Sequence, residues 1–236
     1  MTQLKFAVFT RLCPPYVKVR YIDREFHEPD SGAVMVDTGL TLAIKGSVVS
    51  VDYIKYVMHY SRKYITLFVI PDTWDYNQHH VNVLRFIDLT RRLRSTNNMV
   101  PILVAHYFYY YTNEYLELLN ELSEIFPTVL LGVPGNMVTV LPRPFKCVRK
   151  QTVCNQYIVS VANIVRKYGF KVHILGVARK TLDFIVRNNI NGIVSVDTDK
   201  TSVRFPHRRE YCEKFREWLQ PYEQPPLDKW FYELIT

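Results

Sequence analysis

Short runs of apolar, often β-branched residues recur along this chain, and four of them stop at a side chain that can do chemistry. The four runs, each with the residue that ends it, are 33–36 with Asp37, 64–71 with Asp72, 100–105 with His106 and 192–196 with Asp197. Such runs predict strands buried on both faces, as in a parallel sheet covered by helices. Parallel α/β sheets build their sites at the carboxyl ends of their strands. We therefore expect these four side chains to gather at one end of the fold.

Segments with apolar residues at helical spacing alternate with these runs. Helices are expected at residues 49–60 with Ser50 as N-cap, 80–93, 112–125, 152–168 closed by Gly169, around 182–186, and 207–219. Further strands are expected at residues 5–9, 128–131 and 171–175. The stretch between the first two strands is expected to be rich in turns, because it contains Pro14-Pro15 and residues 29–32.

Alternating strands and helices with short connections predict a parallel sheet with right-handed crossovers. In about 210 residues, this favours an α/β fold of the small (β/α)₈ TIM-type, complete or with units missing, and its rival is an open doubly wound sheet. We expect one barrel domain over residues 1–220 and a tail over 221–236, packed on the surface through Trp230 and Phe231. Because no strand is followed by a dinucleotide or phosphate-loop motif, no cofactor is expected.

The cysteines and the apolar runs bear on the compartment and on metals. The four cysteines are scattered without a Cys-x-x-Cys pair, which predicts a reduced, intracellular and cytoplasmic protein without disulfides or a zinc ribbon. His79, His80 and His106 fit no standard metal-ligand spacing, so no metal is expected. No run approaches the roughly 18 apolar residues of a membrane span, and the start lacks a signal-peptide pattern, so no membrane contact is expected.

Positive charge is concentrated in the second half of the chain. The net charge is +8, and residues 143–209 alone hold 14 Lys and Arg against 3 Asp and Glu. Such a segment attracts polyanions, because each neutralised phosphate releases counterions. We expect a nucleic acid partner whose phosphates are held by Arg143, Lys146, Arg149, Lys150, Lys200 and Arg204. The alternative is a solvated basic surface that keeps the protein soluble.

The motifs resemble, in chain order, those of the tRNA-guanine transglycosylase family, and best its short relatives without the zinc subdomain. The similar segments, within about residues 33–200, are Val36-Asp37-Thr38-Gly39, Val69-Ile70-Pro71-Asp72, Val104-Ala105-His106, Leu131-Gly132-Val133-Pro134, His173-Ile174-Leu175-Gly176-Val177 and residues 192–197. The resemblance implies a barrel and a base exchange at a guanine nucleotide of RNA or DNA. In that reaction a carboxylate displaces guanine from the anomeric carbon, and a 7-deazaguanine then attacks the covalent glycosyl-enzyme.

The resemblance also implies the catalytic pair. Asp197 would be the nucleophile and Asp37 the general base. The chemistry agrees with carboxylates in these roles, because the C–N bond breaks through an oxocarbenium-like state that an adjacent carboxylate stabilises and then traps. A second acid or base must move protons on the departing and incoming bases.

Five further residues are expected to bind the substrate base, a purine or 7-deazapurine. Asp72 would accept hydrogen bonds from the purine N–H groups. The backbone amides of Gly132 and Val133, in a glycine loop, would donate to the base carbonyl. His106 and Gly176, at the ends of similar strands, would complete the site.

The chain also departs from the family pattern. Leu40-Thr41 stands where the family has an aromatic residue that stacks on the purine, the zinc ligands are missing, and Pro134 removes one amide donor. These departures favour a second hypothesis, a catalytically inactive nucleic-acid-binding barrel. A third is a glycoside hydrolase that uses two of the carboxylates. The aromatic run 107–111 fits base stacking and strand-end packing equally, and His173 is expected to be structural.

Overall fold

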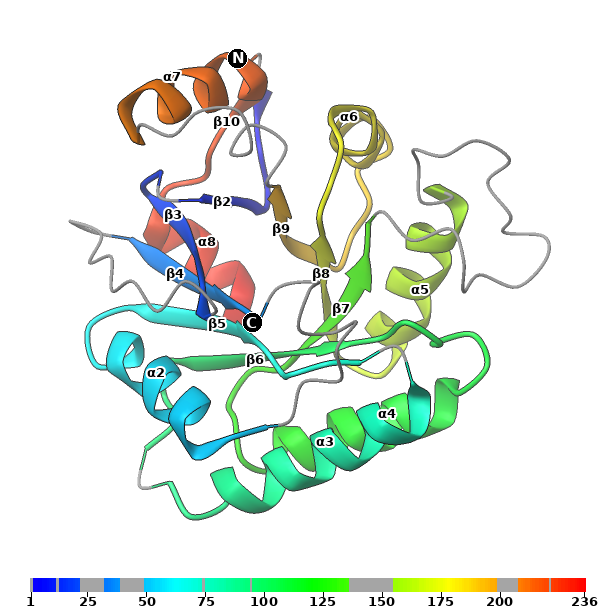
Figure 1. The fold of residues 1–236 in the computed structure, drawn as a ribbon. Coiled ribbons are helices and arrows are strands. Elements are labelled where there is room, and N and C mark those ends of the chain that lie inside the picture. Colours follow the sequence, from blue (N-terminus) through cyan, green and yellow to red (C-terminus); the bar gives the residue numbers. More distant parts are fainter. Residues whose placement is uncertain are drawn as a thin grey trace.

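The structure of the protein is a computed structural model. It describes residues 2–11, 13–21, 32–38, 49–73, 75–93, 95–135, 155–198, 208–220 and 222–236. Figure 1 shows their arrangement, with strands at the centre and helices α2 to α6 around them.

Eight parallel strands form a closed barrel. They are β2 (Ala7–Arg11), β3 (Tyr16–Arg20), β4 (Ala33–Asp37), β5 (Ile65–Val69), β6 (Met99–Val104), β7 (Leu130–Pro134), β8 (Lys171–Leu175) and β9 (Ile193–Thr198). The first and last of these strands close the ring, because β2 pairs with β9 in a register that sets Phe9 opposite Asp197. This closure confirms the TIM-type barrel and excludes the open doubly wound sheet.

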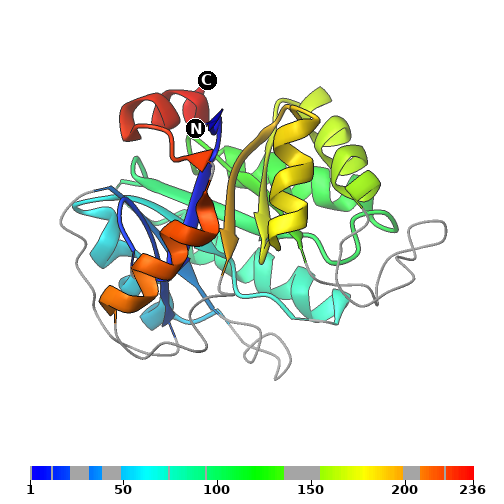
Figure 2. The same ribbon diagram turned by 90° about the horizontal axis from the view of Figure 1, so that it is seen from above.

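The helices begin and end largely where the sequence predicts. They are α2 (Val51–Ser61), α3 (Tyr76–Thr90), α4 (Thr112–Ser123), α5 (Asn155–Lys167), α6 (Arg179–Arg187), α7 (Arg208–Leu219) and α8 (Leu227–Ile235). Ser50 caps α2 by accepting a hydrogen bond from the backbone N–H of Tyr53, as expected. Gly169 follows α5 with a φ of 82°, a conformation that glycine adopts without strain. Helix α7 lies beside β2 (Figure 2), and the hydroxyl of Tyr211 in α7 is hydrogen-bonded to that of Thr10 in β2.

Strand β3 lies where the sequence predicts only turns. Its residues alternate along the strand as Tyr-Val-Lys-Val-Arg. Val17 and Val19 face the core outside the barrel, and Lys18, on the opposite face of the strand, is also buried. An alternating pattern is typical of a strand with one solvated face. Here the polar face turns into the barrel instead, so the run did not stand out as a buried strand.

The C-terminal segment packs through Trp230 and Phe231 as expected, but it does so as a strand and a helix rather than as a surface tail. Residues 222–236 form β10 (Tyr222–Glu223), which pairs with β1 (Thr2–Gln3), and helix α8. Trp230 of α8 is fully buried in the apolar layer inside the barrel. Its ring makes edge contacts with Phe9 and Tyr16, and its Nε1–H donates to the carbonyl of Val194 at 2.8 Å. Helix α8 therefore closes the amino-terminal end of the barrel.

The expectation of unpaired cysteines is also wrong. Cys13, in the connection between β2 and β3, forms a disulfide with Cys212 of α7. The two cysteines are 199 residues apart, so their spacing carries no signal, and only ring closure brings the first connection beside the last helix of the barrel. This pairing removes the argument for a reducing compartment. No helix in the described part of the chain is long and apolar enough to cross a membrane.

Candidate active site

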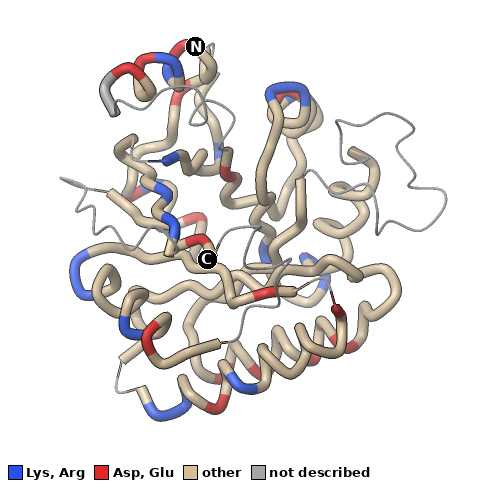
Figure 3. The backbone as a smooth tube through the Cα atoms, viewed as in Figure 1, with Lys and Arg blue, Asp and Glu red and all other residues tan. Residues whose placement is uncertain are grey.

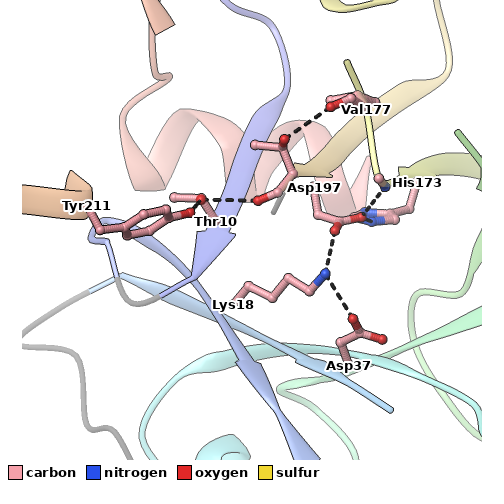
Figure 4. Close-up of polar contacts among 9 residues, drawn as sticks. Thr10, Lys18, Asp37, His173, Val177, Asp197 and Tyr211 are labelled. Atoms are coloured by element: carbon pink, nitrogen blue, oxygen red, sulfur yellow. Dashed lines mark hydrogen bonds and ion pairs between the residues drawn. The ribbon is translucent and has the colours of Figure 1, made fainter. Parts of the chain in front are cut away.

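An ion cluster lies inside the barrel toward the carboxyl ends of its strands. Lys18 of β3 stands between two carboxylates, Asp197 of β9 and Asp37 at the end of β4, as Figure 4 shows. Its Nζ lies 2.6 Å from Oδ2 of Asp197 and 2.9 Å from Oδ2 of Asp37. The sequence therefore placed Asp37 and Asp197 correctly at one end of the fold, but gave no sign of the cation that joins them.

Asp197 is the most tightly held side chain of this cluster. Its Oδ2 receives Lys18, and its Oδ1 accepts from the backbone N–H of Gly176 at 2.9 Å and faces Nε2 of His173 at 3.2 Å. Burial alone would raise the pKa of Asp197, but the Lys18 ammonium and the His173 hydrogen bond outweigh it, and the pKa falls well below its usual range. Asp197 is therefore a carboxylate at any physiological pH.

Asp37 is the open member of the pair. Its side chain is 17% exposed, against 2% for Asp197. Because both carboxylates bind the same nitrogen, their Oδ2 atoms lie at most about 5.5 Å apart. Retaining glycosidases hold their two carboxyl groups about 5–5.5 Å apart, whereas inverting ones need a wider gap for a water. The upper bound is below the separation of inverting enzymes and is compatible with that of retaining ones.

A second polar pair stands on the neighbouring strands. Asp72, after β5, and His106, after β6, are both buried, and Nε2 of His106 lies 2.6 Å from Oδ2 of Asp72. Burial raises the pKa of Tyr53, and the nearby charges of Asp37 and then Asp72 raise it further. Asp72 lies at the same end of the barrel as Asp37, because β5 pairs in parallel with β4, and it is hydrogen-bonded to His106.

His79 of α3 is buried beside this pair, with its ring centroid 6.4 Å from that of His106. The pKa of His79 is lowered from 6.5 to about 4, chiefly by burial; Asp72 opposes this shift, and His106 adds to it. The folded protein therefore keeps His79 neutral where the unfolded chain would bind a proton.

We expect this histidine to make folding sensitive to acid. Above pH 6.5 His79 is neutral in both states and its protonation costs no stability. As the pH falls toward about 4, the unfolded chain binds a proton that the folded protein does not, and the free energy of unfolding falls by about 3 kcal/mol. In urea titrations, the stability difference between wild type and His79→Gln should shrink by that amount over this window. The same substitution at the half-buried His59 is the control. A difference that stays constant with pH would contradict a neutral His79.

Two residues expected in a glycine loop are strand residues. Gly132 and Val133 lie within β7, between β6 and β8, and Val133 turns its side chain into the outer core. A Cβ on Gly132 would come within 2.6 Å of Ile102 Cγ2, so this glycine provides space for packing inside the barrel. The expectation of a glycine loop is therefore wrong, and the binding of a base carbonyl by these amides stays a prediction. Gly176, expected to bind the substrate base, donates its backbone N–H to Oδ1 of Asp197.

His173, expected to be structural, is part of the cluster. Its Nδ1 lies 2.8 Å from Ser195 Oγ, and its Nε2 faces Asp197. Ser195, His173 and Asp197 thus have the composition of a hydrolase triad, but Ser195 is fully buried and offers no reachable hydroxyl. A mid-strand histidine beside an inward Ser-x-Asp pattern is the signal that could have identified this contact.

Helix α7 is attached to the rim beside the cluster. The hydroxyls of Tyr211 and Thr10 are hydrogen-bonded, and Thr10 also donates to the carbonyl of Thr198 at 3.1 Å (Figure 4). Thr198 in turn donates to the carbonyl of Val177 at 3.1 Å. With the disulfide, these bonds fix α7 against the strand that carries Asp197.

The expected phosphate-binding residues are not placed by the structure. Arg143, Lys146, Arg149, Lys150, Lys200 and Arg204 lie outside the described residues. Among the described ones, Figure 3 shows α7 carrying charges of both signs. In the part of the chain that is described, no group of three or more His, Cys, Asp and Glu side chains is arranged to hold a metal ion.

Comparisons of the chain with protein-family models, with curated proteins and with solved structures found no match. The resemblance to the transglycosylases therefore stays a prediction from the motifs, and any function must be argued from the site itself.

Proposed function

We propose that this barrel exchanges a purine base on a nucleic acid strand by double displacement at the anomeric carbon. The observation that carries the proposal is the convergence of Asp37 and Asp197 on Lys18, within about 5.5 Å of each other, toward the carboxyl end of a closed barrel. A nucleophile and an acid or base at this distance fit a covalent glycosyl-enzyme.

Asp197 acts as the nucleophile in this scheme. Its carboxylate forms a bond to the anomeric carbon while the bond to the departing base breaks, and the base leaves with the electron pair. The low pKa of Asp197 supports this role, because a nucleophile must be ionised. The departing base takes up a proton from solvent. Asp37, ion-paired with Lys18, is the general base: it takes a proton from the incoming base, which then displaces Asp197.

Lys18 has two consequences for this chemistry. Its ammonium keeps Asp197 ionised in a place where burial alone would favour the acid. It also covers Oδ2 of Asp197, so the substrate reaches the carboxylate only after Lys18 shifts toward Asp37, its second partner. Developing positive charge on the sugar would assist this shift, because it competes with Lys18 for the same oxygen.

In this scheme Asp72 and His106, which follow the neighbouring strands β5 and β6, hold the base. Oδ2 of Asp72 is bound to His106, which fixes the orientation of the carboxylate. In this scheme the oriented carboxylate accepts a hydrogen bond from a purine N–H group. This assignment keeps the roles expected from the resemblance, with His106 acting through Asp72.

A second candidate is a barrel that binds nucleic acid without catalysis. The observation that favours it is the enclosure of Asp197, whose two oxygens are both bound within the protein and whose side chain is 2% exposed. Buried ion clusters of this kind also occur as purely structural features. This candidate predicts salt-dependent binding of an oligonucleotide without any bond exchange.

The two candidates are separated by a trapping experiment. The protein is incubated with RNA or DNA and labelled guanine or a 7-deazaguanine, and we measure incorporation of the label and a covalent adduct on a denaturing gel. The proposal expects both, with the adduct mapped by mass spectrometry to the peptide that contains Asp197. An adduct on another peptide would overturn the assignment of the nucleophile. If neither incorporation of the label nor an adduct is found with either polymer, the proposal is overturned.

A further inference from the structure

The two oxygens of Asp197 have partners of different kinds (Figure 4). Among the described residues, Oδ2 is bound by the ammonium of Lys18 alone, at 2.6 Å. Oδ1 accepts from the backbone N–H of Gly176 at 2.9 Å and lies 3.2 Å from Nε2 of His173. Lys18 ends a flexible aliphatic chain and has a second partner in Asp37, whereas the donors to Oδ1 belong to a backbone and to a buried ring. One oxygen is therefore fixed, and the other can be released.

His173 is in turn held in place by Ser195. Its Nδ1 lies 2.8 Å from Oγ of Ser195, and both residues are fully buried. Because a carboxylate only accepts hydrogen bonds, Nε2 of His173 carries a proton and donates to Asp197, and Nδ1 is left for the serine hydroxyl. A hydrogen bond at each nitrogen fixes the orientation of the ring.

The strand register explains why Ser195 reaches this position. Val172 of β8 pairs with Ile193 of β9. The next residue of β8, His173, pairs with Ser195, so the register shifts and one residue of β9 is passed over. In a regular strand Ser195 would share a face with Ile193, which packs in the core outside the barrel. The shift turns Ser195 toward His173 instead, and bulges are frequent next to active sites, where they redirect a side chain.

We propose that His173, oriented by Ser195, is a positioning residue that presents Oδ2 of Asp197 to the anomeric carbon. The inference rests on the proposed function, since it names the oxygen that reacts. Oδ2 forms the bond to the anomeric carbon while the bond to the base breaks, and the base leaves with the electron pair. Because His173 is fully buried, it acts through Asp197 and does not touch the substrate.

The fixed oxygen has a role in both steps of the exchange. After the first step Oδ1 is the carbonyl oxygen of the glycosyl ester, and it keeps its hydrogen bonds to His173 and Gly176. When the incoming base displaces Asp197, the same two donors stabilise the negative charge that returns to the carboxylate. The residue types are those of a hydrolase triad, but here the carboxylate attacks and the serine hydroxyl anchors the ring.

Nitrogen NMR of the wild-type protein tests the contact without any substrate. In protein labelled with ¹⁵N-histidine, the spectra show which ring nitrogens carry a proton, and the signals of His173 are those missing from His173→Gln. We expect a protonated Nε2, and ring signals that shift in Ser195→Ala. A His173 ring that is protonated at Nδ1 alone cannot donate to Asp197 and would overturn the proposal.

The kinetics of base exchange test the role in catalysis. His173→Leu removes both ring nitrogens and should lower kcat by about tenfold or more with an unchanged KM for the strand. His173→Gln keeps an N–H donor near the place of Nε2 and should recover most of the loss, and Ser195→Ala should show a smaller loss of kcat. A loss confined to KM, or equal losses in His173→Leu and His173→Gln, would indicate a packing role alone and overturn the proposal.

His59→Gln and Ser123→Ala are the matched controls. His59 is half-buried on α2, and Ser123 is exposed at the end of α4, where its hydroxyl donates to the carbonyl of Asn120 at 2.7 Å. Both variants should exchange bases like wild type. Circular dichroism shows whether His173→Leu is folded. If it is not, the proposal is decided by Ser195→Ala, which removes a single oxygen atom, and by the NMR spectra of the wild type.

A crystal structure of the trapped adduct identifies the reacting oxygen directly. We expect the sugar on the oxygen that faces Lys18 in the free protein, with the ester carbonyl within hydrogen-bond distance of His173 and Gly176. A sugar on the oxygen that faces His173 would overturn the proposal.

The outcomes also separate this inference from the proposed function. Base exchange that is unaffected in both His173→Leu and Ser195→Ala would leave the proposed function standing and refute the positioning role. A wild type that exchanges no base would refute the proposed function and with it the reacting oxygen, and the NMR spectra would still decide whether His173 holds Asp197.

Discussion

Replacing Asp197 by Asn is expected to abolish the covalent adduct and to lower base exchange by a factor of about 10,000 or more. An amide cannot act as the nucleophile, and the loss of a covalent nucleophile removes most of the rate that its catalytic unit supplies. Incorporation of labelled base and the adduct band on a denaturing gel measure the two effects. Binding of the strand, measured by anisotropy, should survive, because the rim residues remain in place.

The control is Asp88→Asn, an exposed aspartate on α3 that should leave both readouts unchanged. Circular dichroism must show that Asp197→Asn is folded, since its amide loses the ion pair with Lys18. An Asp197→Asn protein that still forms the adduct would refute the assignment of the nucleophile. A folded variant with full exchange activity would refute the proposed mechanism as a whole.

Replacing Lys18 by Met is expected to lower the free energy of unfolding by about 3–5 kcal/mol. The change removes the cation and leaves two carboxylates within about 5.5 Å of each other, one of them fully buried. Urea unfolding, followed by circular dichroism, measures the loss. The deficit should shrink as the pH falls, because without Lys18 burial raises the pKa of Asp197 and protonation relieves the repulsion.

Lys55→Met is the matched control, since Lys55 is an exposed lysine on α2 and should change stability by less than about 0.5 kcal/mol. The double variant Lys18→Met with Asp197→Asn should recover part of the loss, because it removes one of the two unpaired charges. A cost below about 1 kcal/mol for Lys18→Met, or a cost that does not depend on pH, would show that the ion cluster is not formed in solution.

The position of Lys18 explains how the buried Asp197 stays ionised, as the proposed nucleophile must. An ionised carboxylate alone inside a barrel would take up a proton. The shared ammonium prevents that and keeps Asp37 close to Asp197. Under the proposed function, catalysis and stability would depend on this one contact, so substitutions in the cluster should be measured for both.

The strands that could be predicted were those with continuous apolar runs. Strands β4 and β9 stood out because both of their faces are buried, and their polar ends identified Asp37 and Asp197. Strand β3 was missed because its inward face carries Lys18, which in a local pattern reads as a solvated face. Gly132 was assigned to a loop because glycine is typical of turns, although here its small size serves the packing inside the barrel.

By itself, the sequence determined the alternation of strands and helices, the helix ends at Ser50 and Gly169, and the end of the fold at which Asp37 and Asp197 lie. Periodicity and capping depend on neighbours a few residues apart, and these are visible in the chain. Only the tertiary structure decided that Lys18 joins the two carboxylates, that Cys13 meets Cys212 and that Trp230 enters the barrel. Lys18 and Asp197 are 179 residues apart, and such contacts exist only because the ring of strands closes.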